Sequence, residues 1–337
     1  MKIDTLNKHP EVNFGKTGVL LVNLGTPDST SWLDIRKYLK EFLSDRREIE
    51  LNPFIWQIIL NVIILTFRPS KTAHAYKKIW MKETNESPLL YYTRSQSLKL
   101  NEQLGNESLF IDFAMRYGNP SIKLKLDNLK NKGCENIVVL PLYPQYAAAT
   151  TATVCDEVYR CLMEMRWQPS LQIIPHYESN SSYITALVNS INNKLSEIEW
   201  KPDLILASYH GIPKSYFDKG DPYQCYCQKT SRLIKENFNK IPLETTFQSR
   251  FGPSEWLTPY TDKTLESLPS KGVKNILVIC PGFSSDCVET LEEINIQGRE
   301  IFLKSGGKNF DLIPCLNDNI DHINLFKKLV EKYLVAK

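Results

Sequence analysis

The chain has 337 residues, which is enough for two domains or for one large α/β unit with a sizeable core. Its hydrophobic content of 42% and charged content of 23% are those of an ordinary globular protein. The formal net charge is only +3 and the basic residues are scattered, so the composition argues against nucleic acid as a partner.

The N-terminus and the cysteines both favour a reducing cytosol. Residues 1–16 are polar, with neither the apolar core of a secretory signal nor the arginine-rich character of a transit peptide. The eight cysteines include no C-x-x-C pair, which favours free thiols over a disulfide framework. We therefore expect a cytoplasmic protein.

The first predicted element is a buried strand over residues 18–24, GVLLVNL. Residues 25–28 are predicted to form a turn, and residues 28–31 offer N-caps for a helix that runs to Phe42. Strand, turn and helix in this order are typical of a doubly wound α/β domain. There is no G-x-G-x-x-G motif, so a dinucleotide site has no support.

Residues 53–67, PFIWQIILNVIILTF, are the most apolar stretch of the chain. The stretch is predicted to be too short to span a bilayer, and Gln57 and Asn61 interrupt it. Two interpretations remain open. It is either a buried core helix or an exposed apolar lip, bordered by arginines such as Arg68, around a greasy ligand or on a membrane surface.

Helices and strands then alternate. A helix is expected to begin at residues 87–88 and to run to Leu104, and residues 110–116 and 133–141 are predicted strands. In the second half, strands are predicted over residues 203–209 and 275–281, with a polar loop over 214–227 and a helix from Thr230.

Two strand motifs occur twice in the chain. GCENIVVLP (133–141) resembles GVKNILVICP (272–281), and GVLLVNLGTP (18–27) resembles LILASYHGIP (204–213). The motifs lie further apart in the first half, which is explained by an insertion over about 45–92. We therefore predict an α/β fold of two similar Rossmann-like halves, 17–160 and 161–334, with parallel sheets and an active cleft between them.

His210 is the main candidate for chemistry. It follows a buried strand, and ligands of open α/β sheets bind outside the carboxyl ends of strands. Gly211 behind it is expected to let the backbone turn without steric cost. The alternative is a hydrogen-bonded structural histidine without a catalytic role.

A row of acidic residues follows the last strong strand. On a helix that begins near Asp286, Glu289 and Glu293 share a face with it, because neighbours three and four positions apart lie on one side. A capping pair formed by Asp286 and Glu289 is the alternative, but it does not explain Glu293.

Together, His210 and the acidic row suit general acid–base catalysis or a weak, open divalent-cation site. Four aromatic side chains, together with the apolar lip, suggest a cleft for a large flat ligand: Tyr76, Tyr143, Trp256 and Phe283. Packing of Trp256 between prolines is the alternative for that residue.

Seven motifs, in order over residues 17–334, resemble those of the ferrochelatase family, closest to its proteobacterial form: NLGTP (23–27), FLSDRR (42–47), SPL (87–89), LPLYPQY (140–146), SYHGIP (208–213), TFQSRFGPSEWLTPYT (246–261) and GFSSDCVETLEEI (282–294). The resemblance implies a lyase that inserts Fe²⁺ into protoporphyrin IX to give protoheme, the terminal step of heme biosynthesis, and releases two protons. It also implies a chelatase-like fold of two similar Rossmann-like halves.

The resemblance implies roles for individual residues as well. His210 and Glu289 match the pair described as contacting the metal, and Asp286 and Glu293 match the acidic line that continues from it. Further residues match porphyrin-pocket, propionate-side or wall positions: Arg68, Tyr76, Ser87, Arg116, Tyr143, Trp256 and Phe283.

Some members carry a [2Fe–2S] cluster, one of whose cysteines lies where this chain has alanines at 147–149, so no cluster of that arrangement is expected. Cys225 and Cys227, with Cys280 or Cys287, are the alternative set of thiolates. Iron is then a substrate, and no cofactor is expected. Cys287 stands where some relatives have histidine, which puts a role in metal delivery in doubt. Peripheral contact of residues 53–67 with the inner face of the cell membrane and a monomeric state are further expectations.

Three alternatives remain. The chain could take coproporphyrin instead of protoporphyrin, it could insert cobalt, or it could be a tetrapyrrole or metal carrier without catalysis. The apolar stretch at 53–67 favours the more hydrophobic protoporphyrin, and a proton acceptor that faces an acidic row argues against a carrier.

Overall fold

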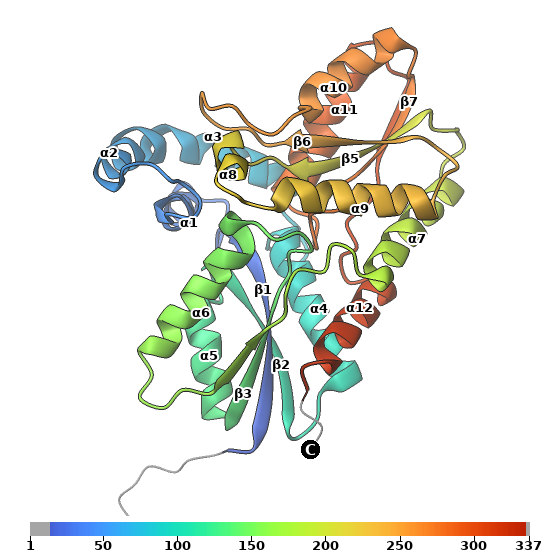
Figure 1. Ribbon diagram of the computed structural model, residues 1–337. Helices are drawn as coiled ribbons and strands as arrows, with labels where there is room; N and C mark the ends of the chain where they lie inside the picture. Colours follow the sequence, from blue (N-terminus) through green and yellow to red (C-terminus); the bar gives the residue numbers. More distant parts are fainter. Residues whose placement is uncertain (1–13, 335–337) are drawn as a thin grey trace, which may run out of the picture.

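The computed structural model describes residues 14–334 and contains two parallel sheets of four strands each (Figure 1). In spatial order the first sheet consists of β2 (Leu109–Gly118), β1 (Lys16–Thr26), β3 (Cys134–Pro141) and β4 (Ser170–Ile173). The second consists of β6 (Leu243–Gln248), β5 (Leu204–His210), β7 (Asn275–Ile279) and β8 (Asn309–Leu312). The strands predicted from apolar runs are all present, and the α/β prediction is confirmed.

The internal repeat is visible in the strand order. The two halves follow the same pattern, with β1 and β5 central and β3 and β7 beside them. Val19 pairs with Val138 in the first sheet, and Ile205 pairs with Leu277 in the second. The central strands are covered on both faces, which explains why their sequences are continuous apolar runs.

Helices surround both sheets. Those of the first half are α1 (Trp32–Ser44), α2 (Pro53–Ile59), η2 (Leu60–Ile64), α3 (Leu65–Ile79), α4 (Pro88–Leu104), α5 (Ile122–Asn131), η3 (Ala148–Ala152), α6 (Thr153–Met163) and α7 (Ser181–Glu197). Those of the second half are α8 (Lys214–Asp218), α9 (Tyr223–Asn237), α10 (Thr261–Ser267), η4 (Leu268–Lys271), η5 (Val288–Gly298), α11 (Arg299–Lys304) and α12 (Ile320–Glu331).

The caps explain where helices begin. Ser31 accepts a hydrogen bond from the third residue of α1, and Ser87 does the same for α4, as the sequence predicted. The prediction of a helix start at Thr230 was wrong. α9 begins at Tyr223, because Pro222 precedes it and the Asp221 carboxylate accepts from the Tyr223 N–H.

The two halves share part of their helical layer. The predicted division at residue 160 falls within α6, whereas the first sheet continues through β4 to Ile173. α12, near the C-terminus, packs against α4 of the first half and against α7 (Figure 1). One apolar core therefore joins Val19 of the first sheet to Ile205 of the second and to Phe326 of α12.

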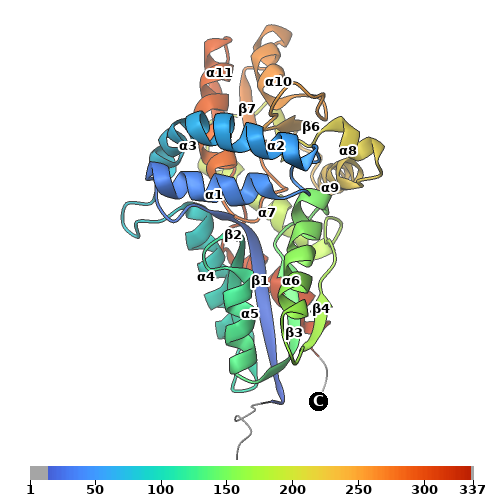
Figure 2. The same ribbon diagram turned by 90° about the vertical axis from the view of Figure 1, so that its left-hand side faces the viewer.

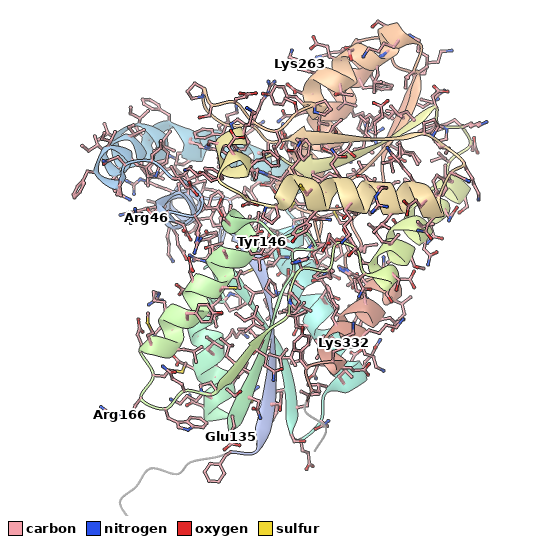
Figure 3. The ribbon with its side chains drawn as sticks, viewed as in Figure 1. Arg46, Glu135, Tyr146, Arg166, Lys263 and Lys332 are labelled. Atoms are coloured by element: carbon pink, nitrogen blue, oxygen red, sulfur yellow. The ribbon has the colours of Figure 1, made fainter. Side chains whose placement is uncertain are left out.

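The carboxyl ends of the strands in the first sheet point toward the second half (Figure 1). Tyr146 lies at this level, where the two halves meet (Figure 3). Close by, the N–H of Ala148 donates to Asp221 of the second half over 2.7 Å. Loops of both halves are thus brought to one region of the molecule.

The apolar stretch belongs to a longer helix than predicted. α2, η2 and α3 form one helix over Pro53–Ile79, which has 27 residues and is long and apolar enough to cross a membrane by length and composition alone. The prediction that it is too short was therefore wrong. In this structure it packs along α1, one above the other in Figure 2.

This helix has one buried and one exposed face. Trp56 and Leu60 are buried in a cluster with residues of α1, and the Trp56 indole donates to the Leu43 carbonyl. The exposed side chains are apolar: Phe54 (84% exposed), Ile55, Ile58, Val62, Ile63 and Phe67 (74% exposed). The helix is therefore not a fully buried core helix, and its exposed apolar face is compatible with the predicted lip.

We expect His322 of α12 to make the fold sensitive to acid. Its ring is buried against Phe326, its Nδ1–H donates to the Asn317 carbonyl over 2.7 Å, and burial lowers its pKa from the usual 6.5 to about 4 despite nearby Asp318. Between pH 6.5 and 4 the unfolded chain binds a proton that the folded chain excludes, so stability falls as pH falls, by up to about 3 kcal/mol.

The measurement is the free energy of unfolding of wild type and His322→Phe at pH 7 and pH 4. The variant is expected to lose less stability on acidification, because phenylalanine takes up no proton in the unfolded chain. The Asn317 carbonyl keeps a hydrogen-bond donor in the variant, because Gln96 also donates to it. His74→Phe, at an exposed position on α3, is the matched control. Equal acid sensitivity of wild type and His322→Phe would contradict the prediction.

Candidate active site

His210 is the last residue of β5 and is half-buried. Its Nδ1 lies 2.6 Å from the Gly211 carbonyl oxygen, and because a carbonyl only accepts, Nδ1 carries the proton. Nε2 is therefore left as the basic nitrogen of the ring. The Trp256 ring lies beside the imidazole, with 6.5 Å between ring centroids.

Gly211 is required for a different reason than the sequence suggested. Its φ is not in the left-handed region, so no special turn is needed. A Cβ at this position would lie 2.9 Å from the Gln248 carbonyl oxygen and 3.2 Å from Cε3 of Trp256. Glycine therefore permits β6 and Trp256 to approach the histidine closely.

The acidic residues lie on a π-helix, η5, and not on an α-helix. η5 begins at Val288, and its turn is wider than that of an α-helix, which has about 3.6 residues per turn. Cys287 caps it, with its N–H donating to the Thr290 hydroxyl over 3.0 Å. The predicted capping pair of Asp286 and Glu289 is therefore wrong.

Asp286 lies before η5, so the prediction that it shares a helix face with Glu289 and Glu293 was wrong. Its buried carboxylate accepts hydrogen bonds from the Asn317 amide (2.7 Å), the Thr290 hydroxyl (3.0 Å) and the Cys315 N–H (3.2 Å). These bonds tie the start of η5 to the loop after β8. Asp286 is thus placed to anchor η5.

Glu293 is held from β6. Its carboxylate accepts from the Ser249 N–H (2.8 Å) and hydroxyl (2.5 Å). Burial raises the pKa of Glu293, and the negative charge of Glu289 adds to this, whereas the bonds from Ser249 and the positive charge of His210 act against it. His210, Glu289 and Glu293 therefore lie close enough to influence one another's charge.

A small pocket surrounds Glu289. Tyr76 of α3, Tyr38 of α1 and Ser87 at the start of α4 line its opposite wall. Tyr76 and Ser87, two of the site residues predicted in the first half, thus line the same pocket as Glu289. Burial raises the pKa of Tyr76, and the charge of Glu289 raises it further. The tyrosine therefore stays neutral and presents a hydroxyl to the site.

Arg68 lies near the same carboxylate. Its guanidinium is 4.3 Å from the centre of the Phe251 ring, and its Nη1 is buried without a hydrogen-bond partner among the described residues. Burial lowers the pKa of Arg68, and the charge of Glu289 opposes that shift. A buried, unpaired donor of this kind is suited to an anionic group of a ligand.

The other predicted pocket residues differ in their surroundings. Arg116 forms an ion pair with Asp45 and donates to Thr153, so its hydrogen bonds are used within the first half. Tyr143 is buried with a hydroxyl that has no partner in residues 14–334. Phe283 is half-buried against Leu89 and Cys287 of the pocket.

Within residues 14–334, no group of three or more His, Cys, Asp or Glu side chains is arranged to hold a metal ion. A cation at His210 and Glu289 would therefore have few protein ligands, which suits an ion that is passed on. Cys225 is exposed whereas Cys227 is buried, so these thiols lie on different sides of α9.

The first half contains a segment equivalent to the start of η5, but without the histidine and the carboxylates. η3 begins after Ala147, whose N–H donates to the Thr150 hydroxyl as that of Cys287 does to Thr290. Ala149 takes the place of Glu289 in this motif, and Leu24 precedes Gly25 as His210 precedes Gly211. The histidine and the carboxylates thus belong to the second half alone.

Sequence reasoning did not single out Gln248, Ser249 or Tyr38. Gln248 and Ser249 lie in the quoted motif TFQSR, and Ser249 has a φ of 65°, which is unusual for a residue other than glycine. Nothing in the sequence indicates that their side chains turn toward η5. The pairing of β6 with β5 provides that information.

Two similar halves, with a histidine and carboxylates where they meet, define a chelatase-type protein. The fold resembles solved structures of SirB from Bacillus subtilis. The structure with Fe³⁺ has a TM-score of 0.59 at 10% identity, covering 95% of this chain and 96% of the other. The sirohydrochlorin chelatase SirB from the subspecies spizizenii, in complex with cobalt, has a TM-score of 0.57 at 8% identity, covering 94% and 95%.

Sequence comparison gives the particular family. The ferrochelatase family model matches residues 16–334. The chain is 54% identical to a ferrochelatase of Allorhizobium ampelinum, over 97% of this chain and 96% of the relative, and 50% identical to one of Francisella tularensis subsp. novicida, over 96% and 98%. The chain belongs to the ferrochelatase family.

Proposed function

We propose that the chain inserts Fe²⁺ into protoporphyrin IX to form protoheme, with His210 and the carboxylates Glu289 and Glu293 at the reacting centre. Membership in the ferrochelatase family supports a metal chelatase of the lyase class with a porphyrin and iron as substrates. The observation that carries the residue assignment is that Glu293 of η5 is held by Ser249, the residue after Gln248, and Gln248 is the register partner of His210.

The chemistry requires ring strain and proton removal. A free porphyrin points its four nitrogen lone pairs inward in the ring plane, and two nitrogens carry protons. A ring held in a bent shape tilts lone pairs and N–H bonds out of plane, and binding energy from the rest of the ring supplies that strain. Two N–H bonds break, two protons leave and Fe²⁺ binds the four nitrogens.

His210 Nε2 is the proton acceptor in this proposal, because Nδ1–H is fixed on the Gly211 carbonyl. Glu289 and Glu293 either hand over the iron or lead the protons away. Burial raises the pKa of Glu293, which makes this carboxyl a better proton acceptor than an exposed glutamate. We assign no such step to Asp286, because its carboxylate is engaged by Thr290, Cys315 and Asn317 and anchors η5.

The experiment that tests this function is anaerobic turnover of the purified protein with protoporphyrin IX and Fe²⁺, followed by loss of porphyrin fluorescence. Coproporphyrin III and Co²⁺ are run in parallel and distinguish the alternative substrates. Rapid loss of fluorescence with protoporphyrin and Fe²⁺ is expected. Tight porphyrin binding without metal insertion would instead support a carrier.

We expect Arg68 to bind a propionate of the porphyrin through its unpaired buried donor. In Arg68→Met the KM for protoporphyrin should rise about tenfold with kcat changed much less, because a charged hydrogen bond is lost in both ground and transition states. Lys71→Met, at an exposed position on the same helix, is the matched control. An unchanged KM in Arg68→Met would exclude Arg68 from the binding site.

The exposed face of Pro53–Ile79 supports a cytoplasmic protein that rests on the inner face of the cell membrane. A helix that keeps Trp56 and Leu60 packed on α1 while exposing Phe54, Ile58 and Phe67 suits a peripheral position. Replacing Phe54, Ile58, Val62 and Phe67 with serine should abolish flotation with vesicles of anionic phospholipid. Serine at Leu124 and Met163, which are exposed on α5 and α6, is the control and should leave flotation unchanged.

A further inference from the structure

Gln248 is the register partner of His210 on the neighbouring strand and is buried, with 4% of its surface exposed. The predicted functional residues do not include it, and it has no group that could accept a porphyrin proton. Its side chain nevertheless contacts every element that carries a reactive group.

On one side the amide reaches η5. Its Nε2 donates to the main-chain carbonyl of Glu289 over 2.8 Å and lies 3.4 Å from Oε2 of Glu293. Both of these groups are acceptors, so the NH₂ end of the amide must face them. Gln248 therefore supplies the hydrogen bond that fixes the main chain at Glu289.

On the other side the same residue holds β5. Its Oε1 accepts from the Ser208 hydroxyl over 2.7 Å, and its main-chain carbonyl accepts from the Gly211 N–H over 2.8 Å. Ser208 and Gly211 flank His210 in the chain. One buried side chain and its own carbonyl thus link the histidine strand to the carboxylate helix.

Only an amide meets both requirements at this position. A carboxylate could accept from Ser208 but would face the Glu289 carbonyl and the Glu293 carboxylate with the wrong charge. An apolar side chain of the same shape would fill the space without either hydrogen bond. The donor at Nε2 is therefore the property that a test must remove.

We propose that Gln248 is a positioning residue, which fixes η5 so that the carboxylates Glu289 and Glu293 face His210 at the distance that metal insertion needs. The assignment rests on the proposed function for its catalytic meaning. Its structural content, that the amide holds η5 in place, can be measured independently. A displacement of about 1 Å at a reacting group is enough to cost about a hundredfold in rate.

The test compares Gln248→Met with wild type. Methionine keeps the length of the side chain, and Ser208 keeps a partner because its hydroxyl also lies 2.9 Å from that of Thr261. We expect kcat for iron insertion to fall about tenfold to a hundredfold while the KM for protoporphyrin changes less than about threefold. Gln168→Met, which removes an amide that donates to the Leu162 main-chain carbonyl over 2.8 Å in the first half, is the matched control and should keep kcat within about twofold of wild type.

Hydrogen exchange provides a readout that needs no activity. Amides of residues 288–298 should exchange about fivefold to tenfold faster in Gln248→Met, with the rest of the chain unchanged, because one buried hydrogen bond is lost. If methionine prevents folding, Gln248→Asn replaces it with the same expectations, because an amide that is one methylene shorter does not span from Ser208 to η5. If wild type does not insert iron, the proposed function is refuted. If residues 288–298 nevertheless exchange faster in Gln248→Met, the finding that the amide holds η5 in place is retained.

Three results would overturn the positioning role. The first is unchanged exchange of residues 288–298. The second is faster exchange over the whole chain, which would mean a general loss of stability. The third is a rise in KM with kcat unchanged, which would place Gln248 in substrate binding.

Discussion

His210→Ala is expected to lower kcat for iron insertion about a hundredfold to ten-thousandfold, the range that a positioned acid–base group contributes. The reason is the hydrogen bond from Nδ1–H to the Gly211 carbonyl, which leaves Nε2 as the basic nitrogen of this ring. Alanine removes that nitrogen. The chain should still fold, because His210 is the last residue of β5 and is only half-buried.

The measurement is anaerobic porphyrin fluorescence quenching with and without added imidazole. Imidazole should restore part of the rate in His210→Ala, because it can occupy the space of the lost ring and accept the proton. His74→Ala, at an exposed histidine on α3, is the matched control. A rate above about a tenth of wild type in His210→Ala would remove the histidine from the mechanism.

The fold could be predicted where both faces of a strand are buried. β1, β3, β5 and β7 are apolar almost throughout, because each lies inside its sheet with helices on both faces, and this pattern is readable without the structure. β4, β6 and β8 were not predicted. β4 and β8 have four residues each, and all three strands keep partly exposed positions, so no run of apolar residues marks them.

The apolar helix shows a different limit of prediction from sequence. Its composition permits a core helix, a lip or a membrane span, and nothing in the sequence gives the position of α1 beside it. The burial of Trp56, Leu60 and Leu65 on that neighbour is what divides the helix into two faces. Tertiary packing, which local periodicity does not contain, therefore decided between the interpretations.

For the site, the sequence predicted which residues take part better than it predicted how they are arranged. His210 at the end of a strand follows from topology, but the position of Asp286 depends on the type of helix that carries Glu289 and Glu293. The α-helical periodicity assumed for the sequence brings all three together, whereas η5 begins two residues later and has a wider turn. A π-helix has no sequence signature that would have revealed this.

Glu289→Gln is the second change with a large expected effect. Glu289 lies in the pocket that Tyr76, Ser87 and Tyr38 complete, and its charge acts on Arg68 and on Glu293. Glutamine keeps the shape but can neither attract Fe²⁺ as an anion nor accept a proton, so kcat should fall about a hundredfold or more. Porphyrin binding, measured by fluorescence without metal, should stay close to wild type.

Two further variants are measured beside Glu289→Gln: Glu293→Gln as the comparison and Glu300→Gln as the control. Glu300 forms an exposed ion pair with Lys304, so its variant should behave as wild type. If Glu289 hands over the iron, raising the Fe²⁺ concentration should partly restore the rate of Glu289→Gln and leave that of Glu293→Gln low. If Glu289 leads protons away, Fe²⁺ should restore neither variant. Wild-type activity in Glu289→Gln would contradict both roles and would leave His210 and Glu293 as the reacting pair.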